Sequence, residues 1–268
     1  MKSRIRAIEK AEGIYLYDTS GKDYIDLVSG VSVSNLGHRH PEVVQAVKDQ
    51  LDKHMHLLVY GEFVQYPQVK FAELLTEHLP DSLDNIYFVN SGSEANEGAM
   101  KLAKRFTGRT EMIACSRAYH GSTHGAISLM GDEKFRNPFR PLLPDIRYID
   151  FNKEEHLQLI TTRTACVIVE PIQAEAGIVL PENDYLQKLR KRCDETGTLL
   201  IFDEVQTGFG RTGHLFAMKK YGVTPDIFTI AKGMGGGMPI GAFVAPKKIM
   251  DRLKKNPRLG HITTFGGH

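Results

Sequence analysis

The stretch TLLIFDEVQTGFGRTG, residues 198–213, joins a short apolar run to two acids and a glycine-rich turn. An apolar run of this length, bounded by turn residues, is typical of a buried strand. Asp203 and Glu204 follow the run directly, and Gln206 comes two positions later. A buried carboxylate is costly unless it meets a cation. We therefore expect one of the two acids to face a cation. The alternative is that both acids cap the next turn and point to water.

Six other runs of this kind alternate with amphipathic segments along the chain. Such alternation indicates a largely parallel sheet covered by helices, an α/β fold. Before these runs, residues 13–27 alternate apolar and polar side chains on both sides of a Ser-Gly turn and predict a hairpin. Helices are predicted at 41–55 and 66–79, each with a proline at or near its start. The six runs are IYFVN (86–90), EMIACS (111–116), DIRYID (145–150), ACVIVEP (165–171), DIFTIAK (226–232) and AFVAP (242–246).

The balance of charges argues against nucleic-acid and membrane-surface partners. The 268 residues include 34 Lys and Arg against 32 Asp and Glu, a net charge of +2. No apolar run approaches the length of a membrane span, and the first residues lack the apolar core of a signal peptide. Cys115, Cys166 and Cys193 are odd in number and lack metal-ligand spacing, which predicts free thiols in a reducing compartment. A cytoplasmic location is expected.

A metal site is the weakest of the chemical alternatives. His38, His40, His54 and His56 lie close together in the sequence. Their spacing spans a loop and a helix end, and no carboxylate completes a ligand set. We therefore expect no metal.

Two further strand ends carry side chains suited to a ligand, because ligands of an open parallel sheet bind at the carboxyl ends of its strands. After the first of the six runs, Ser91, Gly92 and Ser93 precede a helix whose backbone N–H groups suit a phosphate. The alternative is an ordinary N-cap, since Ser-x-x-Glu also matches a capping box. After the second run, Tyr119 is placed either to stack on a planar ligand or simply to pack.

The stretch TIAKGMGGGMPIGA, residues 229–242, places Lys232 at a strand end beside several glycines. A phosphate-binding P-loop would place its lysine after the glycines and continue as a helix, whereas this segment returns to a strand. The glycines remove side chains from around Lys232. A partly desolvated amine has a lowered pKa and suits imine chemistry, and the alternative is a surface lysine.

Taken together, these strand ends supply a phosphate-binding helix start, an aromatic ring, an acid and a lysine at one edge of the sheet. These are the parts that pyridoxal 5'-phosphate requires. The lysine forms a Schiff base with the cofactor, and the acid keeps the ring nitrogen protonated so that the ring accepts electrons.

Five motifs, in the same order, resemble those of the class-III aminotransferases, the acetylornithine, ornithine and 4-aminobutyrate group of fold-type-I pyridoxal-phosphate-dependent enzymes. The likeness runs over nearly the entire chain and implies a large domain with a mostly parallel seven-stranded sheet between helices. The motifs are NSGSEANEGAMKLAK (90–104), AYHGST (118–123), VEPIQAEAGI (169–178), FDEVQTGFGRTG (202–213) and TIAKGMGGGMPIGA (229–242).

The resemblance implies catalytic and ring-binding roles for four residues. Lys232 would form the Schiff base and then move the proton between the substrate and the cofactor. Asp203 would pair with the pyridine nitrogen, and Gln206 would reach the ring hydroxyl. Tyr119 would stack on the ring.

It also implies phosphate and substrate contacts. Gly92 and Ser93 would hold the phosphate. Thr264 would bind the phosphate of the neighbouring subunit's cofactor, because the family builds its sites across a homodimer interface. Glu175 matches the acid that masks an arginine in several members and so lets one site accept two substrates.

Two positions depart from the family pattern and bear on the substrate. After Tyr-His-Gly, the ornithine and acetylornithine types generally carry an arginine for a substrate carboxylate, but this chain has Ser122. Val31 replaces the aromatic residue that ornithine enzymes use in their pocket. Ser122 leaves the identity of the substrate open, whereas Val31 disfavours ornithine and leaves acetylated or other ω-amino donors.

The resemblance divides the chain into an N-terminal segment of hairpin and helix, 1–55, and a large domain, 56–268. The family continues past the glycine-rich loop at HITTFGGH (261–268) with a small C-terminal domain that carries the switch arginine. We therefore expect the chain to be a fragment with an incomplete large domain. Such a fragment should expose apolar surface and bind cofactor poorly.

The reaction that the resemblance implies is a ping-pong transfer of an amino group from an ω-amino or acetylornithine-like donor to 2-oxoglutarate. An aminomutase or racemase of the same family is the nearest alternative. Gln206 and Glu175 favour the aminotransferase, since aminomutases typically differ at both positions. A truncated, non-catalytic cofactor-binding fragment is the other alternative.

Overall fold

The computed structural model describes residues 7–59 and 61–268. Its strands are β1 (Ile8–Glu12), β2 (Tyr15–Asp18), β3 (Asp23–Ile25), β4 (Asn85–Val89), β5 (Glu111–Cys115), β6 (Ile146–Ile149), β7 (Thr164–Val169), β8 (Leu199–Asp203), β9 (Ile227–Ile230) and β10 (Gly241–Ala245). Its α-helices are α1 (Ser29–Ser32), α2 (Pro41–Leu51), α3 (Tyr66–Glu77), α4 (Gly92–Thr107), α5 (His124–Ser128), α6 (Glu133–Arg136), α7 (Tyr185–Thr196), α8 (Ala217–Tyr221) and α9 (Lys247–Met250). Short 3-10 helices are η1 (Asn137–Phe139), η2 (Glu154–Leu159), η3 (Lys232–Gly235) and η4 (Asp251–Lys254).

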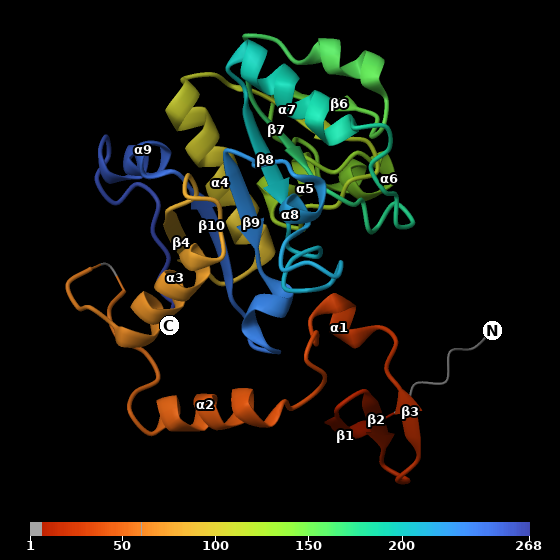
Figure 1. Ribbon diagram of the computed structural model, residues 1–268, viewed down its shortest axis with the longest axis vertical. Helices are drawn as coiled ribbons and strands as arrows, with labels where there is room; N and C mark the ends of the chain where they lie inside the picture. Colours follow the sequence, from red (N-terminus) through yellow and green to blue (C-terminus); the bar gives the residue numbers. More distant parts are fainter. Residues whose placement is uncertain (1–6, 60) are drawn as a thin grey trace.

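A seven-stranded sheet in the order β4-β10-β9-β8-β7-β5-β6 forms the body of the molecule (Figure 1). β10 runs antiparallel to both of its neighbours, and the remaining strands run in one direction. The predicted α/β fold with a mostly parallel seven-stranded sheet is therefore confirmed, and each predicted apolar run forms one strand. The carboxyl ends of β5, β7, β8 and β9 consequently meet at one edge of the sheet.

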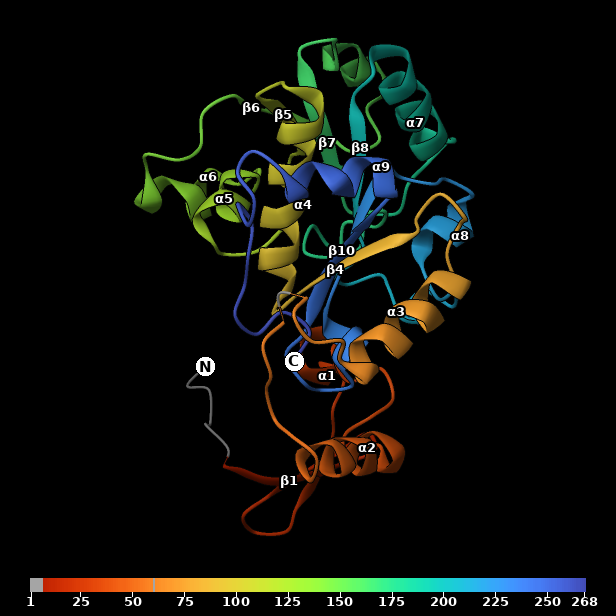
Figure 2. The ribbon, with the colours of Figure 1, turned by 90° about the vertical axis from the view of Figure 1, so that its left-hand side faces the viewer.

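Apolar side chains on the two faces of the sheet form two separate cores. On one face, Leu186 and Leu189 of α7 pack with strand residues such as Phe202 and Phe228. On the other face, α4 contributes small and branched side chains that pack against Ile168 and Ile201. Figure 2 shows α4 on one side of the sheet and α3, α7 and α8 on the other, and α9 packs into the same core as α4. Because side chains alternate along a strand, the strands that are buried on both faces are almost wholly apolar.

The N-terminal part forms a separate three-stranded antiparallel sheet, β1-β2-β3, followed by α2. The predicted hairpin is confirmed as β2 and β3, but β1 was not predicted. The helix predicted at 41–55 ends at Leu51. The N-terminal part lies below the large sheet in Figure 1. It contacts the loop after β8, where the Asn35 amide donates to the carbonyl of Phe209 at 2.9 Å.

Candidate active site

A cavity of about 440 Å³ opens at the carboxyl edge of the large sheet. Loops that follow five of its strands contribute to the lining. The sequence predictions that this cavity brings together are Gly92, Ser93, Tyr119, Asp203, Gln206 and Lys232. A volume of this size lies in the range of small-molecule sites.

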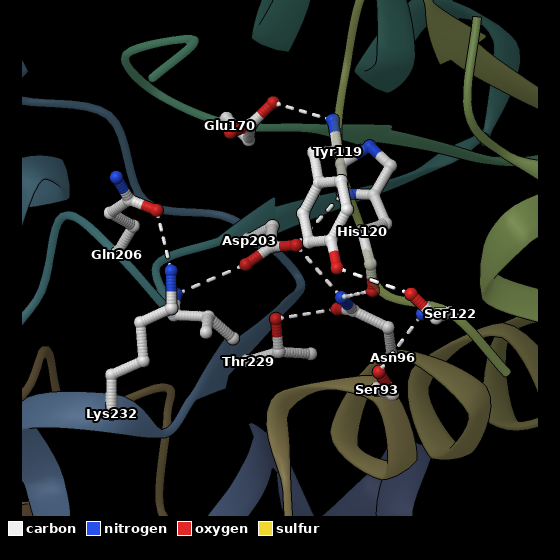
Figure 3. Close-up of polar contacts among 11 residues, drawn as sticks. Ser93, Asn96, Tyr119, His120, Ser122, Glu170, Asp203, Gln206, Thr229 and Lys232 are labelled. Atoms are coloured by element: carbon white, nitrogen blue, oxygen red, sulfur yellow. Dashed lines mark hydrogen bonds and ion pairs between the residues drawn. The ribbon is translucent and has the colours of Figure 1, made fainter. Parts of the chain in front are cut away.

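Asp203 ends β8 and points into the cavity with three hydrogen-bond donors around it (Figure 3). One carboxylate oxygen lies 2.8 Å from Nδ1 of His120 and accepts the amide of Asn96, also at 2.8 Å. The other oxygen accepts the backbone N–H of Val205 at 3.0 Å. Since a carboxylate can only accept, Nδ1 of His120 carries the proton. Of the two acids, Asp203 is therefore the one that faces a side chain able to carry a positive charge, the imidazole of His120.

His120 is fully buried beside this carboxylate. Burial alone disfavours the charged imidazole. The hydrogen bond and charge of Asp203, together with the charge of Glu170, outweigh burial and raise the pKa of His120. His120 had no predicted role, although the Tyr-His-Gly motif lies after β5, at the same edge of the sheet as Asp203.

Glu204 does not line the cavity, and its side chain is buried against the start of α8. Its carboxyl accepts the N–H groups of Ala217 and Met218 at the start of α8, at 2.6 and 2.7 Å, and the hydroxyl of Thr207. Burial raises the pKa of Glu204 to about 7. The alternative in which both acids cap a turn and face water is therefore wrong, because Glu204 caps a helix inside the protein and Asp203 lines the cavity.

Asn96 lines the cavity and connects α4 with β8, β9 and the loop after β5, and no role was predicted for it from the sequence. Its amide donates to Asp203 and to the carbonyl of His120, each at 2.8 Å, and its oxygen accepts the hydroxyl of Thr229 at 2.7 Å. Figure 3 shows this network extending from α4 to the ends of β8 and β9. A polar side chain next to the fully buried Ala95 was the available signal, because a buried amide requires partners.

The Ser-Gly-Ser stretch at the start of α4 both caps the helix and lines the cavity. Ser91 is the N-cap and accepts the N–H of Glu94 at 3.2 Å, so the capping prediction is confirmed. The first N–H groups of a helix have no partner within it, and those of Gly92 and Ser93 lie at the cavity. Ser93 also accepts the N–H of Ser122 at 3.3 Å. The helix start therefore remains suited to an anion.

Two glycines allow the close approaches that shape this helix start. A side chain at Gly92 would meet Val205 at 2.8 Å. Gly121 has a φ of +122°, and a side chain there would collide with Ser93. Both positions therefore require glycine for space, and Gly121 also requires it for its backbone conformation.

Lys232 follows β9 by two positions and opens η3. Its amine donates to the side-chain oxygen of Gln206. Burial lowers the pKa of Lys232, although the charges of Asp203, Glu175 and Glu170 oppose that shift. The expected partly desolvated amine is therefore present.

The glycines around Lys232 have a different function from the one expected. Gly237 lines the cavity. A side chain at Gly233 would collide with Asn35, and one at Gly235 would approach Ile240 to 2.8 Å. Gly233 and Gly235 therefore make room for neighbouring side chains of the protein. The prediction that these two glycines clear space around the lysine is wrong.

Three predicted site residues do not line the cavity. Val31 lies in α1 and is 54% exposed. Glu175 is exposed in the turn after β7, and Thr264 is exposed near the end of the chain. Their roles remain predictions.

The three cysteines are free, as predicted, and all three are buried. Among residues 7–59 and 61–268, no cluster of three or more His, Cys, Asp or Glu side chains is arranged to hold a metal ion. Within the same described residues, no helix is both long and apolar enough to cross a membrane.

A lysine, a strand-end acid and a helix start at the carboxyl edge of this sheet define a fold-type-I transferase architecture. The family model for class-III aminotransferases matches residues 2–268. The chain belongs to this family.

Relatives and solved structures agree with this assignment. The chain is 45% identical to an acetylornithine aminotransferase of Methanopyrus kandleri over 96% of its own length and 65% of that protein. It is 40% identical to a [LysW]-aminoadipate semialdehyde/glutamate semialdehyde transaminase of Sulfolobus acidocaldarius, over 97% of this chain and 66% of that protein. A transaminase from the marine bacterium Virgibacillus covers the whole chain with a TM-score of 0.93, at 31% identity and over 65% of its own chain.

A further solved structure contains ligands. The taurine:2-oxoglutarate aminotransferase of Bifidobacterium kashiwanohense, in complex with PLP and glutamate, has a TM-score of 0.91 and 33% identity. It covers all of this chain and 67% of its own. The chain thus spans about two thirds of the length of these proteins.

Proposed function

We propose that the protein is a pyridoxal-phosphate-dependent aminotransferase that transfers an amino group from an ω-amino or acetylornithine-like donor to 2-oxoglutarate in two half-reactions. The observation that carries the proposal is that Lys232, with its lowered pKa, shares one cavity with the Asp203–His120 pair and the start of α4. The names of the relatives support the reaction class. A ping-pong order is expected because the product of the first half-reaction leaves before the second substrate binds.

The residues of the cavity fit the cofactor. The N–H groups at the start of α4 and the hydroxyl of Ser93 suit its phosphate. Asp203, whose oxygens are held by three donors, suits a protonated ring nitrogen. Tyr119 and Val205 both line the cavity and offer surfaces for a planar ring. When bound, pyridoxal phosphate supplies an electron sink for the carbon that carries the amino group.

The chain's own groups supply attack and proton transfer. Burial of Lys232 increases the fraction of neutral amine, which is the form that attacks a carbonyl and accepts a proton. Gln206 accepts from this amine and so orients it. Because Asp203 is fixed by its donors before any ligand arrives, little reorganisation is needed when charge develops on the ring.

We also propose a cytoplasmic homodimer in which Thr264 contacts the partner's cofactor. The exposure of Thr264 and the apolar side chains exposed in the N-terminal part support an intermolecular contact. The free, buried cysteines support a reducing compartment. The proposal includes the division of the chain into an N-terminal segment, 1–55, and a large domain, 56–268. It also includes contact of Glu175 and Val31 with the substrate.

An amino-donor panel tests the reaction. The purified protein is supplied with pyridoxal phosphate, 2-oxoglutarate or pyruvate, and N-acetylornithine, ornithine, 4-aminobutyrate or simple amines. Glutamate should form from an ω-amino or acetylated donor and should disappear in Lys232→Ala. Isomerisation of a donor without any oxo acid would support an aminomutase instead. Cofactor binding without turnover of any donor would support a non-catalytic protein.

A further inference from the structure

Glu170 is a buried acid of the cavity to which neither the sequence motifs nor the proposed reaction gives a role. It follows β7, between the loop after β5 that carries Tyr119 and the end of β8 that carries Asp203. Glu170 is 5% exposed and lines the cavity. An acid in such a place requires partners or a raised pKa.

The carboxyl of Glu170 holds the backbone of the aromatic residue. Its Oε2 atom accepts the N–H of Tyr119 at 3.1 Å, as Figure 3 shows. At the far end of the same residue, the Tyr119 hydroxyl lies 3.2 Å from Oγ of Ser122. Tyr119 is 40% exposed, so packing alone does not fix its ring. The hydrogen bond to Glu170 ties this residue to the neighbouring strand.

The surroundings of Glu170 make its charge sensitive to pH. Burial raises its pKa to about 7, while the charge of His120 lowers it and that of Asp203 raises it. The N–H groups of Tyr119 and of the following turn favour the ionised form. Lys232 and the thiol of Cys115 are the other titratable groups that interact with it.

We propose that Glu170 is a positioning residue of the active site, which fixes the Tyr119 ring over the cavity through the Tyr119 amide and places a carboxyl beside the His120–Asp203 pair. The inference rests on the proposed function, because the ring is taken to cover the bound cofactor. The ionised carboxylate is the stronger acceptor for the Tyr119 N–H, so the hold on Tyr119 is firmest above neutral pH.

Three variants test the proposal. Glu170→Ala removes the acceptor, Glu170→Gln keeps an acceptor oxygen without the charge, and Glu182→Gln is a matched control at an exposed acid farther along the chain. Two readouts are the dissociation constant for pyridoxal phosphate and the visible circular dichroism per bound cofactor, which reports ring orientation. The third, measured without cofactor, is hydrogen exchange of the peptide that contains Tyr119.

In Glu170→Ala, the Tyr119 amide should exchange at least about tenfold faster, and cofactor should bind about tenfold more weakly with a reduced dichroism. Glu170→Gln should match the wild type near pH 6, where Glu170 is protonated, and should fall below it near pH 8. The charge of Glu170 also raises the pKa values of His120, Lys232 and Cys115, so the variants are compared at each pH by the exchange of the Tyr119 amide, which is measured without cofactor. Glu182→Gln should behave as wild type throughout.

The proposal is overturned if Glu170→Ala leaves Tyr119 exchange unchanged, or if its cofactor dichroism equals that of the wild type. An equal loss in Glu170→Gln at both pH values would also contradict it, because a purely structural role does not depend on charge. A wild type that binds no cofactor would refute the proposed function, and the exchange measurement would still decide the role of Glu170.

Discussion

The N-terminal part and the large sheet of this molecule differ in how much of their apolar surface is covered. Among residues 7–59 no side chain is buried, and Leu27 is 90% exposed. In the large sheet every residue of β5, β7, β8, β9 and β10 is buried. The sheet with its helices therefore forms cores of its own. The N-terminal part has regular secondary structure but no core of its own, and its apolar side chains remain exposed.

The largest expected effect separates the two regions directly. Phe228 is fully buried in β9 and contacts Phe216 edge-on at 5.4 Å between ring centres. Phe228→Ala should lower the free energy of unfolding by about 3–5 kcal/mol. Leu27→Ala should change it by no more than about 0.5 kcal/mol. Urea unfolding of both variants measures the difference, and equal losses would break the comparison.

A somewhat smaller effect concerns the buried acid of the sheet region. The pKa of Glu204 is raised from 4.5 to about 7, so the folded chain holds this proton more tightly than the unfolded chain does. The free energy of unfolding should therefore fall as pH rises from about 4.5 to about 7, by up to about 3 kcal/mol from this group. Glu204→Gln should flatten part of this slope in urea unfolding. An unchanged slope would contradict the assigned burial.

Asn96 should give the next effect. Asn96→Ala leaves Asp203 and the hydroxyl of Thr229 each without one partner, so about 1–3 kcal/mol of stability should be lost. Affinity for pyridoxal phosphate should fall as well, because Asp203 is no longer held. Lys101→Ala, at an exposed position of the same helix, is the matched control for stability. Full cofactor affinity in Asn96→Ala would show that the network does not position Asp203.

The smallest change in the free energy of unfolding is expected for Leu27→Ser, which should instead weaken self-association. Leu27→Ser, at an exposed position of the N-terminal part, should leave the free energy of unfolding within about 0.5 kcal/mol of wild type. If a second copy covers this surface, sedimentation should show weaker self-association. Unchanged association would place the contact elsewhere.

The sequence predicted the sheet because its apolar runs of strand length alternate with amphipathic segments of helix length. It also placed Asp203 and Lys232 at or just after strand ends, and the structure brings both into one cavity. It did not indicate the hydrogen bonds that Asn96, His120 and Glu170 make there. These contacts depend on which strands are neighbours, and no local sequence pattern predicts the order β9-β8-β7-β5. For the same reason, the contacts of Gly233 with the distant N-terminal part could not be foreseen.

Lys232 is proposed to bind pyridoxal phosphate covalently, and this can be measured directly. The cofactor is added, the adduct is reduced with borohydride, and the labelled lysine is mapped by peptide mass spectrometry, with Lys232→Ala as the control. One predominant label should appear on the peptide that contains Lys232 and should be lost in the variant. A label spread over surface lysines, or an equal label in Lys232→Ala, would show that Lys232 does not have this role.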